Sequence, residues 1–171
     1  AALAIYEELG ARRQQALMLG QLGDADQSRR RYPEAIARYE RAAALWNELG
    51  DPAETGYLLG RIGWAFYRSG RTGHAVELLD QALAADRAAG KLKYVSDWLV
   101  YLGLIAARAG NEAGAQRRYR EALEIPAAEV TSEPLYRRGY ALLATGNQRE
   151  SLDMYARALQ VCPGPGPVSE H

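Results

Sequence analysis

Pairs of small residues recur in step along this chain, and they constrain its fold more than any other feature. In each pair a glycine is followed twelve positions later by alanine or serine, and successive glycines are 40, 40 and 36 residues apart. The pairs are Gly23 with Ala35, Gly63 with Ala75, Gly103 with Ala115, and Gly139 with Ser151. Self-similarity at a period of this size is typical of solenoid proteins.

The spacing has a physical explanation. A glycine inside a helix costs roughly 0.5–1 kcal/mol relative to alanine, so its repetition requires a compensating gain. Without a Cβ, one helix can lie close against the next, and a small residue at the facing point completes the contact. Each pair therefore predicts two antiparallel helices, helix A and helix B. A further small residue recurs on helix B at Ala42, Ala82, Ala122 and Ala158.

Residues 59–83 show the unit most clearly, as two predicted helices that meet at Gly70. The motif residues of this copy are Leu59, Ile62, Gly63, Phe66, Gly70, Ala75, Leu79, Ala82 and Leu83. They resemble the tetratricopeptide repeat (TPR) family, whose pattern is W/L-x2-L-G-x2-Y followed by G, A, F/Y and A-L. Four copies in phase cover about 145 of the 171 residues. The resemblance implies an all-α fold, a right-handed α-α superhelix (TPR solenoid) of antiparallel helix pairs.

Some positions depart from the family pattern. Asp26 and Ala106 stand where it has a large apolar residue, Arg30 replaces the turn glycine, and Arg138 replaces a leucine. The repeats are also longer than the minimal unit, at about 40 residues. This longer form is similar to the arrays of kinesin light chains and bacterial signal-transduction regulators.

The alignment of the copies predicts the domain boundaries. Four repeats are expected at residues 11–50, 51–90, 91–131 and 132–161, followed by a flexible Pro/Gly tail at 162–171. Residues 1–10 align at an offset of 40 with the end of the first helix B, so we expect a remnant helix B of a preceding repeat. A genuine N-terminal capping helix is the alternative. Pro126 is expected to interrupt the third helix B.

Composition and charge exclude several classes of function. The formal net charge is zero, which argues against direct binding of nucleic acid. No run of 18 apolar residues is present, so we expect no membrane span. The single cysteine, Cys162, is compatible with a reducing compartment, and we expect a cytoplasmic protein. Lysine occurs only at Lys91 and Lys93, among many arginines, a bias typical of GC-rich bacterial genomes.

No residues combine into a catalytic site. His74 and His171 are the only histidines, and neither has a nucleophile or a metal-ligand partner at a suitable spacing. Cys162 lies beside the Pro/Gly tail without an acid–base pair nearby in sequence. We therefore expect no enzyme activity, no metal and no cofactor.

The remaining candidate is a surface along the A helices. In the second copy one stripe of helix A is expected to face helix B, whereas Tyr57, Arg61, Trp64 and Arg68, with Tyr67 beside them, face elsewhere. In TPR proteins such stripes line the concave face. The corresponding residues are Asp97, Tyr101, Leu104 and Arg108 in the third copy, and Glu133, Tyr136 or Arg137, and Tyr140 in the fourth. In the first copy they are the more polar Leu17, Gln21, Asp24 and Ser28.

These residues predict a peptide-binding groove. Tyrosine, tryptophan and arginine anchor many interfaces, and arginine can clamp a carboxylate. We expect a protein or peptide ligand with acidic and apolar side chains. Arg61 and Arg108 are expected to face the groove, because a charged head between helices would be costly. Alternatively, the aromatic residues pack between neighbouring A helices and only line a filled channel.

Other functions remain open. The chain is expected to be a non-enzymatic TPR protein–protein interaction module; the alternatives are the ligand-sensing arm of a larger bacterial transcriptional or signalling regulator, and a purely structural piece. Apolar residues of the last helix, Leu152, Tyr155 and Leu159, predict self-association. The lysine–asparagine clamp of chaperone-tail binders is absent, because Gly20, Asp24, Tyr57 and Arg61 occupy the matching stripe.

Overall fold

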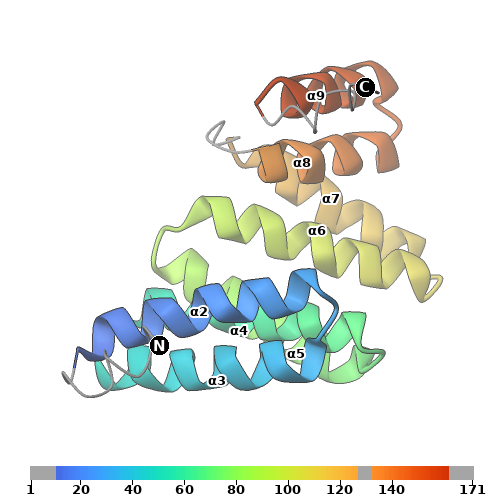
Figure 1. The fold of residues 1–171 in the computed structure, drawn as a ribbon. Coiled ribbons are helices and arrows are strands. Elements are labelled where there is room, and N and C mark those ends of the chain that lie inside the picture. The colour runs from blue at the N-terminus through green and yellow to red at the C-terminus, as the bar shows by residue number, and fades with distance from the viewer. Residues whose placement is uncertain (1–10, 127–131, 162–171) are drawn as a thin grey trace, which may run out of the picture. The chain divides into compact units, whose positions relative to one another are not determined.

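The structure is a computed structural model that describes residues 11–126 and 132–161. Eight α-helices and no strand occupy these ranges (Figure 1). They are α2 (Arg12–Ser28), α3 (Tyr32–Glu48), α4 (Pro52–Arg68), α5 (Thr72–Ala88), α6 (Leu92–Arg108), α7 (Glu112–Glu124), α8 (Ser132–Ala144) and α9 (Gln148–Val161). The expected remnant helix at 1–10, most of the connection after Pro126 and the tail at 162–171 lie outside the described residues.

The helices form consecutive antiparallel pairs. Helix α2 packs on α3, α4 on α5 and α8 on α9, and contacts also join α3 to α4 and α7 to α8. The predicted all-α fold of antiparallel helix pairs is therefore confirmed. The chain divides into two compact units, residues 1–98 and 99–171, and the division falls within α6. Each unit is described by itself below.

The turns that follow α2, α3, α4, α5, α6 and α8 share one backbone geometry. In each of these six turns one residue has a positive φ, and the following N–H donates to a carbonyl five residues back, as Arg71 does to Phe66 at 2.9 Å. This is the Schellman ending of an α-helix, which favours glycine because a Cβ is strained there. Glycine occupies five of the described positive-φ positions, and Arg30, with φ 60°, is the exception that the sequence identified.

The recurring small pairs lie where helix A meets helix B. A Cβ on Gly23 would lie 2.5 Å from Cε1 of Tyr39, and a Cβ on Gly63 would lie 3.0 Å from Cγ of Leu79. Gly103 lies equally tightly against the Tyr119 ring, and the Ser151 hydroxyl donates to the Gly139 carbonyl at 2.8 Å. The repeated glycines are all buried. The close approach predicted from their spacing is therefore confirmed.

Two departures from the family pattern have a structural reason. Asp26 is buried, and its carboxylate accepts from Arg38 and Arg31, both at 2.5 Å, so ion pairs replace an apolar contact. Arg138 on α8 donates to the carbonyls of Ile125 and Leu123, at 2.8 and 3.1 Å. Those carbonyls lie at the end of α7, where Pro126 follows and the helix cannot bond them itself. Arg138 therefore supplies hydrogen bonds to carbonyls at the end of α7, which the leucine of the family pattern could not do.

In the first unit, Trp98 forms a contact between three helices that was not predicted from the sequence. The Trp98 indole packs directly against Gly60, where there is no room for a Cβ. Its Nε1 donates to Oδ2 of Asp86 at 2.7 Å, and both side chains are buried. Burial raises the pKa of Asp86, although the bond from Trp98 partly opposes it. The glycine of α4 thus admits a tryptophan that links α4, α5 and the start of α6.

Candidate functional site

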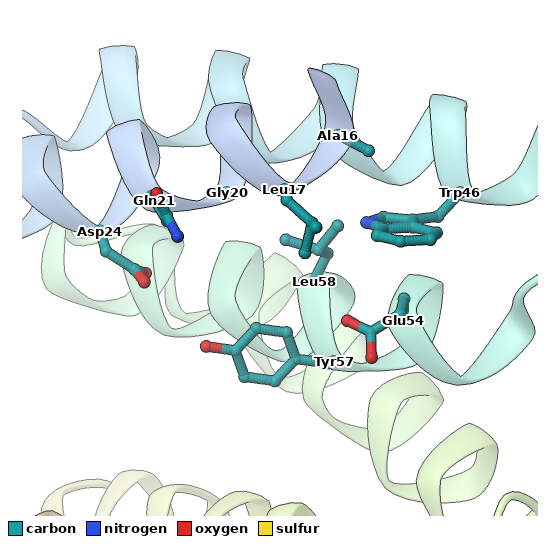
Figure 2. Close-up of a pocket in the computed structure, with 9 residues that line it drawn as sticks. All are labelled: Ala16, Leu17, Gly20, Gln21, Asp24, Trp46, Glu54, Tyr57 and Leu58. Carbon is teal, nitrogen blue, oxygen red and sulfur yellow. The ribbon is translucent and has the colours of Figure 1, made fainter. Parts of the chain in front are cut away.

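A small pocket lies between the A helices of the first two pairs, α2 and α4, within the first unit. Its volume is about 120 Å³. This is smaller than the roughly 300–1,000 Å³ of most small-molecule sites, so the pocket has the size for one side chain. The lining residues, all drawn in Figure 2, are Ala16, Leu17, Gly20, Gln21, Asp24, Trp46, Glu54, Tyr57 and Leu58.

The pocket has an apolar floor and polar ends. Leu17, Trp46 and Leu58 gather on one side of the Tyr57 ring in Figure 2, and Asp24 and Glu54 lie on either side of that ring. Leu58 is buried, whereas Leu17 is 49% exposed and marks the open edge. The helix A stripe predicted for the first copy thus supplies Leu17, Gln21 and Asp24, and Tyr57 comes from the stripe of the second.

Asp24 belongs to a polar network that joins three helices. Its Oδ1 accepts from the Tyr39 hydroxyl at 2.7 Å and also pairs with the Arg61 guanidinium. Arg61 donates to the Tyr39 hydroxyl as well, at 3.2 Å. Burial, together with the bond to Asp24, raises the pKa of Tyr39 far above its ordinary value although Arg61 opposes it. The network fixes α2, α3 and α4 around the inner side of the pocket.

Arg61, which was predicted to face the groove, is mostly buried within this network. Its side chain is only 14% exposed and is bonded to Asp24 of α2 and Tyr39 of α3. Burial by itself lowers the pKa of Arg61, but the oxygens of Tyr57, Tyr39 and Asp24 outweigh burial and raise that pKa. Burying the Arg61 guanidinium between helices costs desolvation energy, and its bonds to the Asp24 carboxylate and the Tyr39 hydroxyl offset this cost.

Glu54 is held at the other end of the pocket. Lys91 donates to its Oε1 at 2.8 Å, and Glu54 also donates its backbone N–H to the capping residue Asp51 at 3.1 Å. Burial disfavours the charge on Lys91, yet the bond to Glu54 raises the pKa of Lys91. Oε2 of Glu54 and Oδ2 of Asp24 accept no hydrogen bond from the described residues. Each pocket carboxylate therefore keeps one oxygen for another donor.

The other predicted groove residues of the first unit form an aromatic cluster with one arginine. Trp64 stacks on Tyr67 with ring centroids 5.3 Å apart, and the Arg68 guanidinium lies 5.7 Å from the Trp64 ring and 5.8 Å from the Tyr32 ring. Arg68 is exposed. We call these four residues the Arg68 patch. Tyr57 packs separately, against Tyr94 at 4.6 Å.

The predicted residues of the second unit have mixed surroundings. Arg137 donates to the Tyr101 hydroxyl at 2.8 Å, so these two are brought together. Tyr140 is 37% exposed and packs edge-on against Tyr119. Leu104 is half-buried and Arg108 is exposed, while the Tyr136 side chain lies outside the described residues.

Sequence reasoning missed part of the pocket. Trp46 lies on α3, a helix B, and so was outside the predicted helix A stripes. Glu54 precedes Tyr57 by three residues, and this spacing places Glu54 and Tyr57 on one face of α4. That spacing was a usable signal, but carboxylates are less common interface anchors than aromatic residues and arginine, on which the predicted groove was based. Among the described residues no cluster of histidine, cysteine, aspartate or glutamate could hold a metal ion. None of the described helices is long and apolar enough to cross a membrane.

Comparison with known proteins gives one family and several similar structures. Residues 14–88 match the family model described as tetratricopeptide repeat. The crystal structure of BtubC (BKLC) from P. vanneervenii is similar, with a TM-score of 0.60 and 16% identity over 92% of this chain and 68% of that chain. The Rap conjugation gene regulator of plasmid pLS20, solved with the Phr* peptide, has a TM-score of 0.72 and 18% identity. That match covers 93% of this chain and 47% of the regulator. No curated protein is significantly similar in sequence.

Proposed function

We propose that this chain, whose residues 14–88 match the tetratricopeptide repeat family model, is a non-enzymatic module that binds a peptide or an extended segment of a partner protein. Repeats of this family are generally protein-interaction modules. The observation that carries the proposal is the pocket between α2 and α4, which has the size for one side chain of a ligand.

The surroundings of the pocket support a peptide ligand. Arg68 lies eleven residues beyond Tyr57 on α4, about 16 Å along the helix axis. An extended peptide spans about 3.3–3.6 Å per residue, so about five residues reach from the pocket to the Arg68 patch. Aromatic side chains with an exposed arginine are common anchors for such a segment. The helix A face of the first unit is therefore proposed as the binding surface.

A second candidate function is the ligand-sensing arm of a larger bacterial regulator. The similar Rap regulator was solved with a peptide, and this chain covers 47% of its length. The sequence encoded on either side of this chain discriminates the two functions. A DNA-binding or effector domain in the same gene favours the sensing arm.

A pocket-filling variant tests the proposed function. A Cβ on Gly20 meets only Leu58 Cδ2, at 4.0 Å, so Gly20→Leu fills the pocket without a backbone clash. Gly73→Leu is the matched control, since a Cβ there meets no atom within 4 Å. A phage-displayed library of random twelve-residue peptides should yield binders of the wild-type chain. Gly20→Leu should weaken their binding at least about tenfold, a loss of about 1.4 kcal/mol, and Gly73→Leu should not.

Two results would contradict binding at this surface: the library yields no peptide that binds, or the selected peptides bind the wild type and Gly20→Leu with equal affinity. Fluorescence anisotropy with labelled synthetic copies of the selected peptides gives the dissociation constants.

Self-association is proposed separately. Leu152 on α9 is 69% exposed and Leu143 on α8 is 49% exposed, whereas the side chains of Tyr155 and Leu159 lie outside the described residues. The mass from light scattering should rise with concentration, and Leu152→Glu should suppress the rise without lowering the melting temperature. A concentration-independent monomer contradicts the proposal.

A further inference from the structure

We propose that the pocket between α2 and α4 selects a basic side chain, lysine or arginine, from the bound peptide. This inference rests on the proposed function and specifies which residue the ligand must carry. It reverses the acidic ligand expected from sequence, because the arginine assigned to bind it is already engaged with Asp24.

The first argument is the state of the two pocket carboxylates. Asp24 uses Oδ1 for Tyr39 and Arg61, and Glu54 uses Oε1 for Lys91. Their second oxygens accept nothing from the described residues, while the side chains remain 46% and 34% exposed. A carboxylate oxygen in a partly enclosed site bonds most strongly to a charged N–H donor.

The second argument is the position of the neighbouring cations. No lysine or arginine lines the pocket. Arg61 and Lys91 bind the carboxylates from outside its lining and hold them in place through the other oxygens. The oxygens that remain for a ligand are therefore carboxylate oxygens turned away from these cations, and an acidic side chain would meet them without a lysine or arginine in the lining, which is unfavourable.

The third argument is the apolar floor. Lysine and arginine carry aliphatic stems that pack on apolar surface while the charged head reaches polar groups. Leu17 and Leu58 offer that surface. A purely aliphatic side chain would use the floor but leave both carboxylate oxygens without a donor. The expected order of preference is basic, then aliphatic, then acidic.

Peptides provide the direct test. Sequences selected from the twelve-residue library should share one basic position, and replacement of that residue by norleucine should weaken binding about tenfold. Replacement by glutamate should weaken binding further. If peptides bind and Gly20→Leu weakens them, but no basic position is shared, the basic selectivity is wrong and the proposed function stands. If no peptide binds, the proposed function itself fails.

Variants of the protein give an independent test. Glu54→Gln should reduce the advantage of the basic peptide over its norleucine form about tenfold. Gln21→Glu, at an exposed lining position, should increase that advantage. Glu40→Gln is the matched control, because Glu40 is an exposed residue of α3 outside the lining. An unchanged ratio in both pocket variants contradicts the proposal, and the peptide comparison decides the question even where a variant folds poorly.

Discussion

Single atoms decide how closely the helices of each pair approach. At Gly23 the space for a Cβ is filled by the Tyr39 ring, whose hydroxyl also anchors Asp24 and Arg61. The ring cannot move away without disturbing that network. Gly23 and Tyr39 therefore form one close contact, and the same contact between Gly103 and Tyr119 explains why glycine recurs at this position of helix A.

Gly23→Ala should destabilise the fold by about 1–3 kcal/mol, because the methyl group forces the Tyr39 ring to shift. Gly73→Ala is the matched control: it lies in α5 with open space around a Cβ, and it should stabilise by up to about 1 kcal/mol. Urea unfolding followed by circular dichroism measures both values. Equal effects of the two substitutions would mean that helix propensity, and not close approach, explains the repeated glycines.

The buried carboxyl of Asp86 should make stability depend on pH. Because burial raises its pKa, the folded chain binds this proton more readily than the unfolded chain, whose carboxyl has a pKa of about 3.9. The contribution of Asp86 to the free energy of unfolding is therefore greatest below that value, and it falls as pH rises through the folded pKa.

Asp86→Asn should remove this dependence while keeping an acceptor for the Trp98 indole. Urea unfolding of both proteins between pH 3.5 and pH 8 checks it: the stability of the wild type relative to the variant should fall as pH increases. A constant or rising difference contradicts the assignment.

At the scale of the helices, the turn glycines and the small-residue pairs explain why the helices and their pairing could be predicted from the sequence. The turn glycines and the small pairs are local features with one physical cause each, so they could be placed without knowledge of distant contacts. The Asp24–Tyr39–Arg61 network and the Trp98–Asp86 bond could not, since they join residues 12 to 37 positions apart through packing geometry. The pocket is of the same kind, because residues of three helices line it.

The turn between α2 and α3 offers a test of this local logic. Arg30 adopts φ 60°, which strains a residue with a Cβ but not glycine. Arg30→Gly should raise the free energy of unfolding by about 0.5–1 kcal/mol. Gly70→Ala, at the equivalent turn with φ 90° and open surroundings, should lower it by about 1 kcal/mol. Thermal unfolding measures both, and a destabilised Arg30→Gly would show that the arginine side chain contributes more than its backbone costs.

At the scale of the whole molecule, the pocket belongs entirely to the first of the two units. A bound ligand stabilises the part of a protein that binds it, by about 2.7 kcal/mol at one hundred times its dissociation constant. Binding of a selected peptide should therefore slow amide hydrogen exchange in α2, α3 and α4. Exchange in α8 and α9 provides the internal control, and a larger effect there than in α2 would place the binding site in the second unit.

Asp24 belongs both to the polar network and to the pocket lining, and under the proposed function this has a consequence for the response to a bound peptide. One oxygen secures α3 and α4, while the residue itself borders the place where a guest side chain would enter. A ligand side chain that donates to the other oxygen would restrict the movement of this carboxylate, and thereby strengthen the contact of α2 with α3 and α4. Under the proposed function, an occupied pocket would therefore hold α2, α3 and α4 more rigidly than an empty one.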